Sequence, residues 1–464
     1  MSSVFDKVYL DNNATTEMPP AVLTEMLEWS NRGNPSAGTE SSEQCRRLMM
    51  NFRRYLGDLM QVRVCCEEDR DGDAAANYAK RRDDQLYKVI ITSGASESNS
   101  AAVCGVIAAY NKNRSCVMPV PNIVVSAIEH KSVLSAVDSL CNQGLASKTV
   151  VQPDARGVIS PDDVARAIGP TTRLVCVMAA NNEIGAVNDI GKIGEICRSR
   201  GVHYHCDAVQ AFGKFPPKAS CTDTLSISFH KVHGPPGVGV LLLKQSSKWL
   251  PLIYGTQNES LRGGTENMPG IAGAYLATRY TMNNRAAKNA RLLALKKHIV
   301  QRLAMDFHVC SYVQYCWMNK QQDAFNNTTF TVHDMLPQVA ARALVDAGLA
   351  SPKLRGVRWP DTMIVLLSTM DQCLPNTLLL SVVRRTPPAV CNSTIKDALD
   401  RDGVVVSVGS ACNTADPRAS HVLYALGADQ FIRQGCLRIS MGDNTTQADV
   451  DRFVLSFARV ARFA

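Results

Sequence analysis

The most regular feature of the sequence is a series of short apolar runs between about residues 88 and 245. The runs are rich in β-branched residues and alternate with stretches of helical spacing: KVIITSG, NIVVSAIEH, RLVCVMAANNE, GVHYHCDAV, TLSISFHK and GVGVLLLK. Short buried strands that alternate with helices are typical of an α/β fold, with a mostly parallel sheet covered by helices on both faces. Ligands bind such a sheet beyond the carboxyl ends of its strands, and polar residues follow several of these runs.

The pattern changes after Arg262. Residues 271–304 have apolar positions at helical spacing, which predicts a long helix leading into a second domain. The later runs TLLLSVV, GVVVSVGS and CLRIS predict strands of a smaller α+β domain. We therefore expect a large domain over 17–270 and a small domain over 1–16 and 271–464. Insertions are expected at about 65–85, which is highly charged, and at about 306–360, which has no clear period.

Composition excludes several classes of protein. The chain has 464 residues, 45% hydrophobic and 20% charged, which is ordinary for a folded globular protein. Its net charge of +8 is spread along the sequence rather than gathered in a stripe, so we expect no stable binding of nucleic acid. No apolar run is long enough to cross a membrane, and the start of the chain lacks a signal-peptide pattern. We expect a cytoplasmic protein whose sixteen cysteines are free thiols.

The first candidate for chemistry is Lys231, which follows the run TLSI together with Ser228 and His230 and precedes a Gly/Pro-rich segment. A lysine in this setting suits a Schiff base beside a phosphate group, although a loop lysine can also be a solvated charge. Asp207 and Gln210 end another run. An acidic side chain there could keep a pyridinium nitrogen protonated, and the amide could donate to a phenolic oxygen. Asp207 could equally be a helix N-cap.

Two places offer groups for a phosphate. Ala95 and Ser96 stand at the start of a predicted helix after the run VIITSG, where backbone amides and a hydroxyl could bind an anion. The same residues could simply begin a capped helix. Thr265 lies beside two glycines and offers a further hydroxyl, with the same ambiguity.

Three more residues complete the candidate site. His130 follows a strand and could stack on a planar cofactor, or it could be structural. Cys412 lies among small and turn-forming residues between a predicted strand and a predicted helix, where a thiol is exposed and can be reactive, or can be inert. Arg438, on the last predicted strand, could bind a carboxylate through two hydrogen bonds or form a structural ion pair.

In this order and spacing, the fragments resemble the cysteine desulfurases of the NifS/IscS-like group, within the class V aminotransferase-like, fold-type I pyridoxal-phosphate enzymes. The resemblance covers most of the chain outside the two insertions. The fragments that carry it are YLDNNATT, GNPSA, TSGASESN, EHKSV, NNEIGAVNDI, HCDAVQAFGK, SFHKVHGPPGVG, RGGTEN, LPNT, GSAC and LRISMG.

The resemblance implies a large domain with a seven-stranded sheet, a homodimer, and pyridoxal 5'-phosphate as cofactor. It implies that Cys412 takes sulfur from L-cysteine as a persulfide, leaves L-alanine, and passes the sulfur to an acceptor, such as a scaffold protein for iron-sulfur clusters or an RNA base. The resemblance also implies the roles of individual residues. Around the cofactor, Lys231 bonds to the aldehyde, Asp207 pairs with the pyridine nitrogen, His130 stacks on the ring and Gln210 contacts the phenolic oxygen. The substrate carboxylate is received by Asn182 and Arg438, and the phosphate is held by Ala95, Ser96, Ser228, His230 and the neighbouring subunit's Thr265.

The chain also departs from the family pattern. Thr39 and Ser42 stand where the family commonly has histidine and glycine after NPS. This change and the two insertions leave partner surfaces and substrate access open. The length of the segment after Cys412 is similar to that of the family members with a long mobile catalytic loop.

Three other interpretations agree less well with the residues. A selenocysteine or cysteine sulfinate lyase can work without an essential thiol, so Cys412 within GSAC argues against it. A non-catalytic scaffold or binding protein has no physical need for Lys231, Asp207, His130, Cys412 and Arg438 together. A zinc site at His203, His205 and Cys206, or at His230 and His233, lacks an accompanying CxxC pair, and strand alternation would put Cys206 on the face opposite the two histidines.

Overall fold

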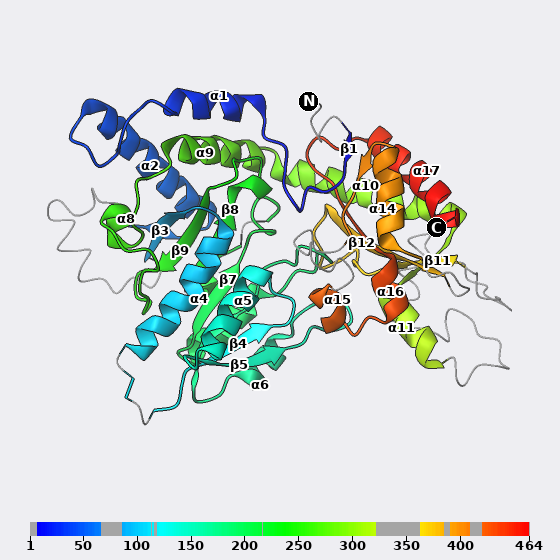
Figure 1. Ribbon diagram of the computed structural model, residues 1–464, viewed down its shortest axis with the longest axis horizontal. Coiled ribbons are helices and arrows are strands. Elements are labelled where there is room, and N and C mark those ends of the chain that lie inside the picture. Colours follow the sequence, from blue (N-terminus) through cyan, green and yellow to red (C-terminus); the bar gives the residue numbers. More distant parts are fainter. Residues whose placement is uncertain are drawn as a thin grey trace.

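The computed structural model describes residues 7–65, 86–112, 114–115, 118–215, 217–321, 362–384, 390–408 and 420–463. Its largest element is an eight-stranded sheet in the order β2-β3-β9-β8-β7-β6-β4-β5, on the left in Figure 1. All neighbouring strands are parallel except β9, which runs antiparallel to β3 and β8. The strands are β2 (Arg63–Val64), β3 (Leu86–Thr92), β4 (Asn122–Ser126), β5 (Ser147–Val151), β6 (Thr172–Cys176), β7 (His203–Asp207), β8 (Thr224–Ser228) and β9 (Gly239–Lys244).

The mostly parallel sheet predicted from the alternating runs is confirmed, with eight strands rather than seven. Its central strands β7, β8 and β9 are buried along their whole length, because helices cover both faces. On β4, Ile123 and Val125 pack in one core with α4 (Ala95–Asn111) and α5 (Lys131–Asn142). Val124 faces the opposite core, which contains side chains of α2 (Glu40–Leu59), α6 (Pro161–Ala167), α7 (Ile190–Ser199) and α9 (Met268–Met282).

A second sheet of four strands lies on the right in Figure 1, in the order β10-β11-β12-β14. One of its faces, with Ile364 and Leu366, packs against helices α10, α14 and α17, and the other, with Met363 and Val365, joins the core of the large sheet. The elements are β10 (His308–Ser311), β11 (Thr362–Leu366), β12 (Thr377–Arg384), β14 (Cys436–Ser440), α10 (Arg285–Asp306), α14 (Asn392–Arg401) and α17 (Gln447–Phe463).

One expectation about the second half of the chain is wrong in detail. The long helix expected over 271–304 is broken into α9 and α10, because Asn284 takes a left-handed conformation with a φ of 54°, which asparagine tolerates better than most residues. The expected insertion at 306–360 stays a prediction, and its first residues form short elements. Strand β10 pairs in parallel with β11, and helix α11 (Tyr312–Gln321) follows it.

The remainder of both expected insertions, 66–85 and 322–360, lies outside the described residues. The expected division of the chain at residues 16 and 270 stays a prediction. No helix in the described ranges is long and apolar enough to cross a membrane. The other elements are β1 (Val8–Tyr9), which pairs in parallel with β13 (Val404–Val405), α1 (Pro20–Trp29), η3 (Ala219–Cys221), η4 (Phe229–Lys231), α8 (Gln257–Ser260), α15 (His421–Ala425) and α16 (Gln430–Gly435).

Candidate active site

The carboxyl ends of the strands bring the predicted site residues to one edge of the large sheet. Strand β7 ends at Asp207 and its parallel neighbour β8 ends at Ser228. Across the sheet, Ser228 pairs with Gly239, which pairs with Thr92 at the end of β3. Helix η4 carries Lys231 directly after β8. Register alone therefore places the lysine, the acidic residue and the start of α4 along the same edge, as the sequence predicted.

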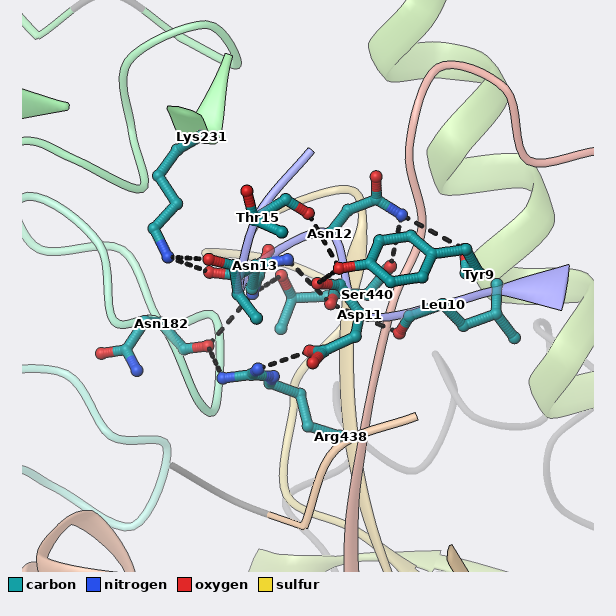
Figure 2. Close-up of polar contacts among 12 residues, drawn as sticks. Tyr9, Leu10, Asp11, Asn12, Asn13, Thr15, Asn182, Lys231, Arg438 and Ser440 are labelled. Carbon is teal, nitrogen blue, oxygen red and sulfur yellow. Dashed lines mark hydrogen bonds and ion pairs between the residues drawn. The ribbon is translucent and has the colours of Figure 1, made fainter. Parts of the chain in front are cut away.

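Lys231 reaches from this edge to the N-terminal segment of the chain. Its Nζ donates to the carbonyl oxygens of Asn13 and Ala14, at 2.7 and 2.5 Å (Figure 2). Gln210 Nε2 donates to the same Asn13 oxygen at 3.1 Å. The Oε1 atom of Gln210 is buried and has no hydrogen-bond partner among the described residues. The amide nitrogen expected to donate to a cofactor oxygen is thus engaged with the backbone, while the amide oxygen has no donor among the described residues.

Asp207 is a buried carboxylate held by two donors. Its Oδ1 accepts from the amide of Val209 at 3.0 Å, and its Oδ2 accepts from Asn99 Nδ2 at 2.8 Å. A turn, not a helix, follows Asp207, so the alternative interpretation as a helix N-cap is wrong. Only 3% of the residue is exposed, and an ionised carboxylate at that depth needs such donors or a cation.

Asn99, on α4, links Asp207 to two histidines. Its Nδ2 also donates to Ser132 Oγ at 2.9 Å, and Ser132 Oγ lies 2.8 Å from Nδ1 of His130. Its Oδ1 lies 3.1 Å from His205 Nε2. Burial lowers the pKa of His205 to about 3, so this ring is neutral and donates its one hydrogen to Asn99. The arrangement fixes the orientation of the Asp207 carboxylate from the side of α4.

His130 is the N-cap of α5, where its Nδ1 accepts from the amide of Ser132 at 3.2 Å. This is the structural role that the sequence left open, and it also fixes the imidazole beside the network of Asp207. Stacking of the ring on a cofactor stays a prediction.

The start of α4 has the properties of an anion site. Gly94 precedes the helix with a φ of 154° and without a side-chain cap. A Cβ on Gly239 would lie 2.6 Å from Gly94, so only glycine allows the two backbones to approach at this point. The first amides of a helix, here those of Ala95 and Ser96, have no partner within the helix and attract anions. Their role in holding a phosphate stays a prediction.

Ser228 is the last residue of β8, and His230 follows it on η4. Ser228 is buried, and His230 Nδ1 lies 3.2 Å from Thr15 Oγ1. Burial, with a contribution from the neighbouring Lys231 charge, lowers the pKa of His230 to about 4. Without a bound anion, this ring is therefore uncharged at neutral pH.

Arg438 lies on β14, 1% exposed, and forms an ion pair with Asp11 at 2.6 Å between Nη2 and Oδ1 (Figure 2). Its Nη1 donates to the backbone oxygen of Asn182 at 3.2 Å. Its Nε is buried without a partner among the described residues. The structural ion pair that the sequence allowed is present, and the N–H group at Nε remains for another acceptor.

The N-terminal segment joins the two cationic residues, and the sequence reasoning missed it. Asn13 accepts from Lys231 through its backbone and donates through Nδ2 to the oxygen of Asn182 at 3.1 Å, while Asp11 holds Arg438. Figure 2 shows Lys231, Asn182 and Arg438 arranged around this segment. The fragment YLDNNATT was among those that carried the family resemblance, so the signal was available although no role was assigned.

Other calls fall outside this cluster. Cys412 lies outside the described residues, and Thr265 is exposed in the segment between α8 and α9, so its role across a subunit interface stays a prediction. His203 and His205 both lie within 3.1 Å of Thr224 Oγ1, on one face of β7. In the ranges that the structure describes, no three His, Cys, Asp or Glu side chains gather so that they could hold a metal ion.

Comparison with known proteins gives the class first. A family model described as aminotransferase class-V matches residues 82–352. The chain is 26% identical to a solved NifS-like protein, with a TM-score of 0.73 and coverage of 99% of this chain and 100% of that one. This protein therefore belongs to the class-V aminotransferase family, whose members use pyridoxal phosphate in general.

Curated relatives narrow the family further. Cysteine desulfurase IscS from Clostridium botulinum is 30% identical over 450 residues, which cover 96% of this chain and 92% of the relative. A mitochondrial cysteine desulfurase from Candida maltosa is 29% identical over 456 residues, covering 96% and 75%. The chain is a member of the NifS/IscS-like cysteine desulfurase family.

Proposed function

We propose that this protein is a cysteine desulfurase that binds pyridoxal phosphate at Lys231 and carries sulfur on Cys412. The observation that supports this best is the convergence of Lys231 and Arg438 on the segment of Asp11 to Ala14, with Asp207 held by donors at the same sheet edge. An amine, a guanidinium and a buried carboxylate are the groups that an amino acid bound to this cofactor requires.

The side chains present fit the cofactor. Lys231 offers an amine for the aldehyde, Asp207 a negative charge for the ring nitrogen, and the glycine-preceded start of α4 a place for the phosphate. The buried and unpartnered Oε1 of Gln210 is an acceptor that a bound group could satisfy, or the amide could turn over and present Nε2 instead. Ser228, His230 and Thr265 of a neighbouring subunit would complete the phosphate contacts, and His130 would cover the ring.

The residues would then divide the work as follows. When bound, pyridoxal phosphate withdraws electrons from the α-carbon of the amino acid. Arg438 and Asn182 would orient the substrate carboxylate, and Lys231 Nζ would take up and return a proton at the substrate. Cys412 would attack the sulfur: the carbon-sulfur bond of L-cysteine breaks, a sulfur-sulfur bond to Cys412 forms, and a proton takes the place of sulfur on the β-carbon. The products are L-alanine and a persulfide.

The described chain before Cys412 ends close to Arg438. The amide and carbonyl of Ser407 pair with Arg438 at 3.1 and 2.7 Å, and Ser407 precedes Cys412 by five residues. An extended chain covers about 3.3–3.6 Å per residue, so five residues span up to roughly 17 Å. The segment that carries the thiol therefore starts beside the arginine proposed to bind the substrate.

The partners and compartment belong to the same proposal. We expect a homodimer, L-cysteine as substrate, and an acceptor protein for the sulfur, such as a scaffold for iron-sulfur clusters. A reducing compartment such as the cytoplasm is supported by the described cysteines, which are free thiols, including the exposed Cys391.

Spectroscopy and product analysis test the proposal together. Purified protein should take up pyridoxal phosphate with a visible absorbance band, and borohydride followed by peptide mapping should find the label on Lys231. With L-cysteine and a thiol reductant, the protein should form equal amounts of alanine and sulfide. A Cys412→Ala variant should keep the band and lose sulfide release.

Cys391→Ala is the matched control for the thiol. Cys391 is exposed, and its hydrogen bonds, above all that with Ser393, lower its pKa, so it is a suitable comparison thiol among residues with no assigned role in the site. Its replacement should leave turnover unchanged. Full turnover in the Cys412→Ala variant, or labelling of a lysine other than Lys231, would overturn the proposal.

A further inference from the structure

Two contacts fix the chain directly after the segment that contains Cys412. Ser420 Oγ lies 2.6 Å from Glu183 Oε2, and His421 Nε2 lies 2.9 Å from the backbone oxygen of Glu129. Ser420 is 8% exposed and Glu183 is fully buried, so water does not compete for their hydrogen bond. None of these four residues has a role in the function proposed above.

The hydroxyl of Ser420 takes part in two hydrogen bonds, one as acceptor and one as donor. As the N-cap of α15 it accepts a hydrogen bond from the amide of Leu423 at 3.2 Å. Its single hydrogen therefore points elsewhere, and the carboxyl group of Glu183 is the acceptor. The distance of 2.6 Å is short for a hydroxyl donor, as is typical when the acceptor is a carboxylate. The start of α15 is thus tied to Glu183 through one oxygen atom.

Glu183 is itself held rigidly. Asn181 Oδ1 accepts from the amides of Glu183 and Ile184, at 2.8 and 3.0 Å, and forms a tight turn. The intervening residue is Asn182, whose oxygen accepts from Arg438. One turn therefore contacts both the arginine proposed for the substrate carboxylate and the residue that follows the Cys412 segment.

The second contact reaches the other half of the site. A backbone oxygen can only accept, so His421 Nε2 carries a hydrogen and donates it to Glu129. Glu129 directly precedes His130, the N-cap that is linked to Asp207 through Ser132 and Asn99. The two contacts therefore dock α15 on residues adjacent to both Asn182 and His130.

We propose that Glu183 and Ser420 are positioning residues that fix the far end of the Cys412 segment at the site, so that the thiol meets the substrate sulfur. This inference rests on the proposed function. The near end is fixed by the pairing of Ser407 with Arg438, and Ser420 follows Cys412 by eight residues. A segment fixed at both ends keeps its thiol at a high local concentration, whereas release of one end lets the thiol sample a larger volume.

Ser420→Ala tests the proposal in the enzyme loaded with pyridoxal phosphate. We expect kcat for sulfide release to fall about tenfold, the loss that one buried hydrogen bond of this kind causes. The KM for L-cysteine and the cofactor absorbance should stay unchanged, because Arg438, Lys231 and Asp207 are untouched. Iodoacetamide should alkylate Cys412 faster than in the unaltered protein, as followed by peptide mass spectrometry. Ser420→Thr keeps the hydroxyl, so kcat and the rate of Cys412 alkylation should return to those of the unaltered protein.

Ser381→Ala is the matched control. Ser381 is also buried, and its hydroxyl also donates to one acceptor, the oxygen of Ile432 at 2.8 Å, but it lies on β12 and its described hydrogen bonds involve neither Glu183 nor a residue of the proposed site. Ser381→Ala should lower the melting temperature about as much as Ser420→Ala does, without changing kcat or the alkylation of Cys412.

Several results would overturn the inference. They are an unchanged kcat and alkylation rate in Ser420→Ala, an equal loss of kcat in Ser381→Ala, and failure of Ser420→Thr to restore the rates. Failure of the proposed function has a different signature, because it would show as turnover that is independent of Cys412 or as cofactor bound away from Lys231, whatever residue stands at position 420.

Discussion

Asn99→Asp is the substitution that best probes the site around Asp207. Asn99 is fully buried: its Nδ2 donates to Asp207 Oδ2 at 2.8 Å and also to Ser132, and its oxygen accepts from His205. The variant has nearly the same shape but replaces the donor to Asp207 by a second carboxyl group. Two carboxyl groups at that distance in a buried site cannot both be ionised, so they would share one proton.

The size of the effect follows from the hydrogen bond that is lost. A hydrogen bond to a charged group contributes about 1.5–3 kcal/mol, and this contribution supports only the ionised form of Asp207. If the ring nitrogen of pyridoxal phosphate needs an ionised partner, the free energy of cofactor binding becomes less favourable by that amount. The dissociation constant should then rise about 10- to 150-fold. The loss of the contacts with Ser132 and His205 lowers stability separately and should appear in unfolding.

Titration of the cofactor-free protein with pyridoxal phosphate, followed by visible absorbance, measures the dissociation constant directly. Urea unfolding of the same sample reports stability, so weaker binding in a folded protein is distinguished from misfolding. Asn99→Ser, which keeps a small donor, should bind more tightly than Asn99→Asp. Wild-type affinity and an unchanged absorbance band in Asn99→Asp would refute the assignment of Asp207 as the partner of the ring nitrogen.

Two further predictions concern the carboxyl groups of Asp11 and Glu129. Asp11→Asn leaves the guanidinium of Arg438 without its charged partner, so urea unfolding should show a loss of about 1–3 kcal/mol, and equal stability would contradict a structural role for the pair. Burial raises the pKa of Glu129 from its ordinary value of 4.5 to about 8, so the folded state holds this proton where the unfolded state releases it. The stability from this proton is fully present below pH 4.5 and is lost as pH rises through about 8. The melting temperature of Glu129→Gln relative to wild type should therefore increase between pH 5 and pH 9, and a constant difference would disprove the shift.

The sequence predicted the large sheet, and the shared edge at which Asp207 and Lys231 lie, because both depend on local signals. Short β-branched runs that end in polar residues identify buried parallel strands, and parallel strands necessarily bring their carboxyl ends to one edge. Asp207 and Lys231 follow such runs, so their placement needed no knowledge of the rest of the chain. The break between α9 and α10 was missed because an Asn-Asn pair interrupts helical spacing only weakly.

Contacts between distant parts of the sequence could not be predicted in the same way. Asp11 and Arg438 are separated by 427 residues, and either could have paired with several other charges. Asn99 looks like any polar position on a helix until His205 and Asp207 are placed beside it. Strand β10 was read as part of an insertion because four residues have no detectable period, and only its pairing with β11 defines it.

The N-terminal segment connects the small sheet to Lys231 on the large one. Strand β1 pairs with β13, and the amide of Asn12 donates to Ser440 on β14, so the segment is anchored to the small sheet. From there Asn13 and Ala14 accept from Lys231 on the large sheet. A displacement of the small sheet would therefore move the segment with it. Both the distance between Arg438 and Lys231 and the positions of the carbonyl oxygens that Lys231 contacts would then change. For this reason, substitutions at Asp11 or Ser440 should alter cofactor binding as well as substrate binding, although neither residue contacts Lys231 in the described hydrogen bonds.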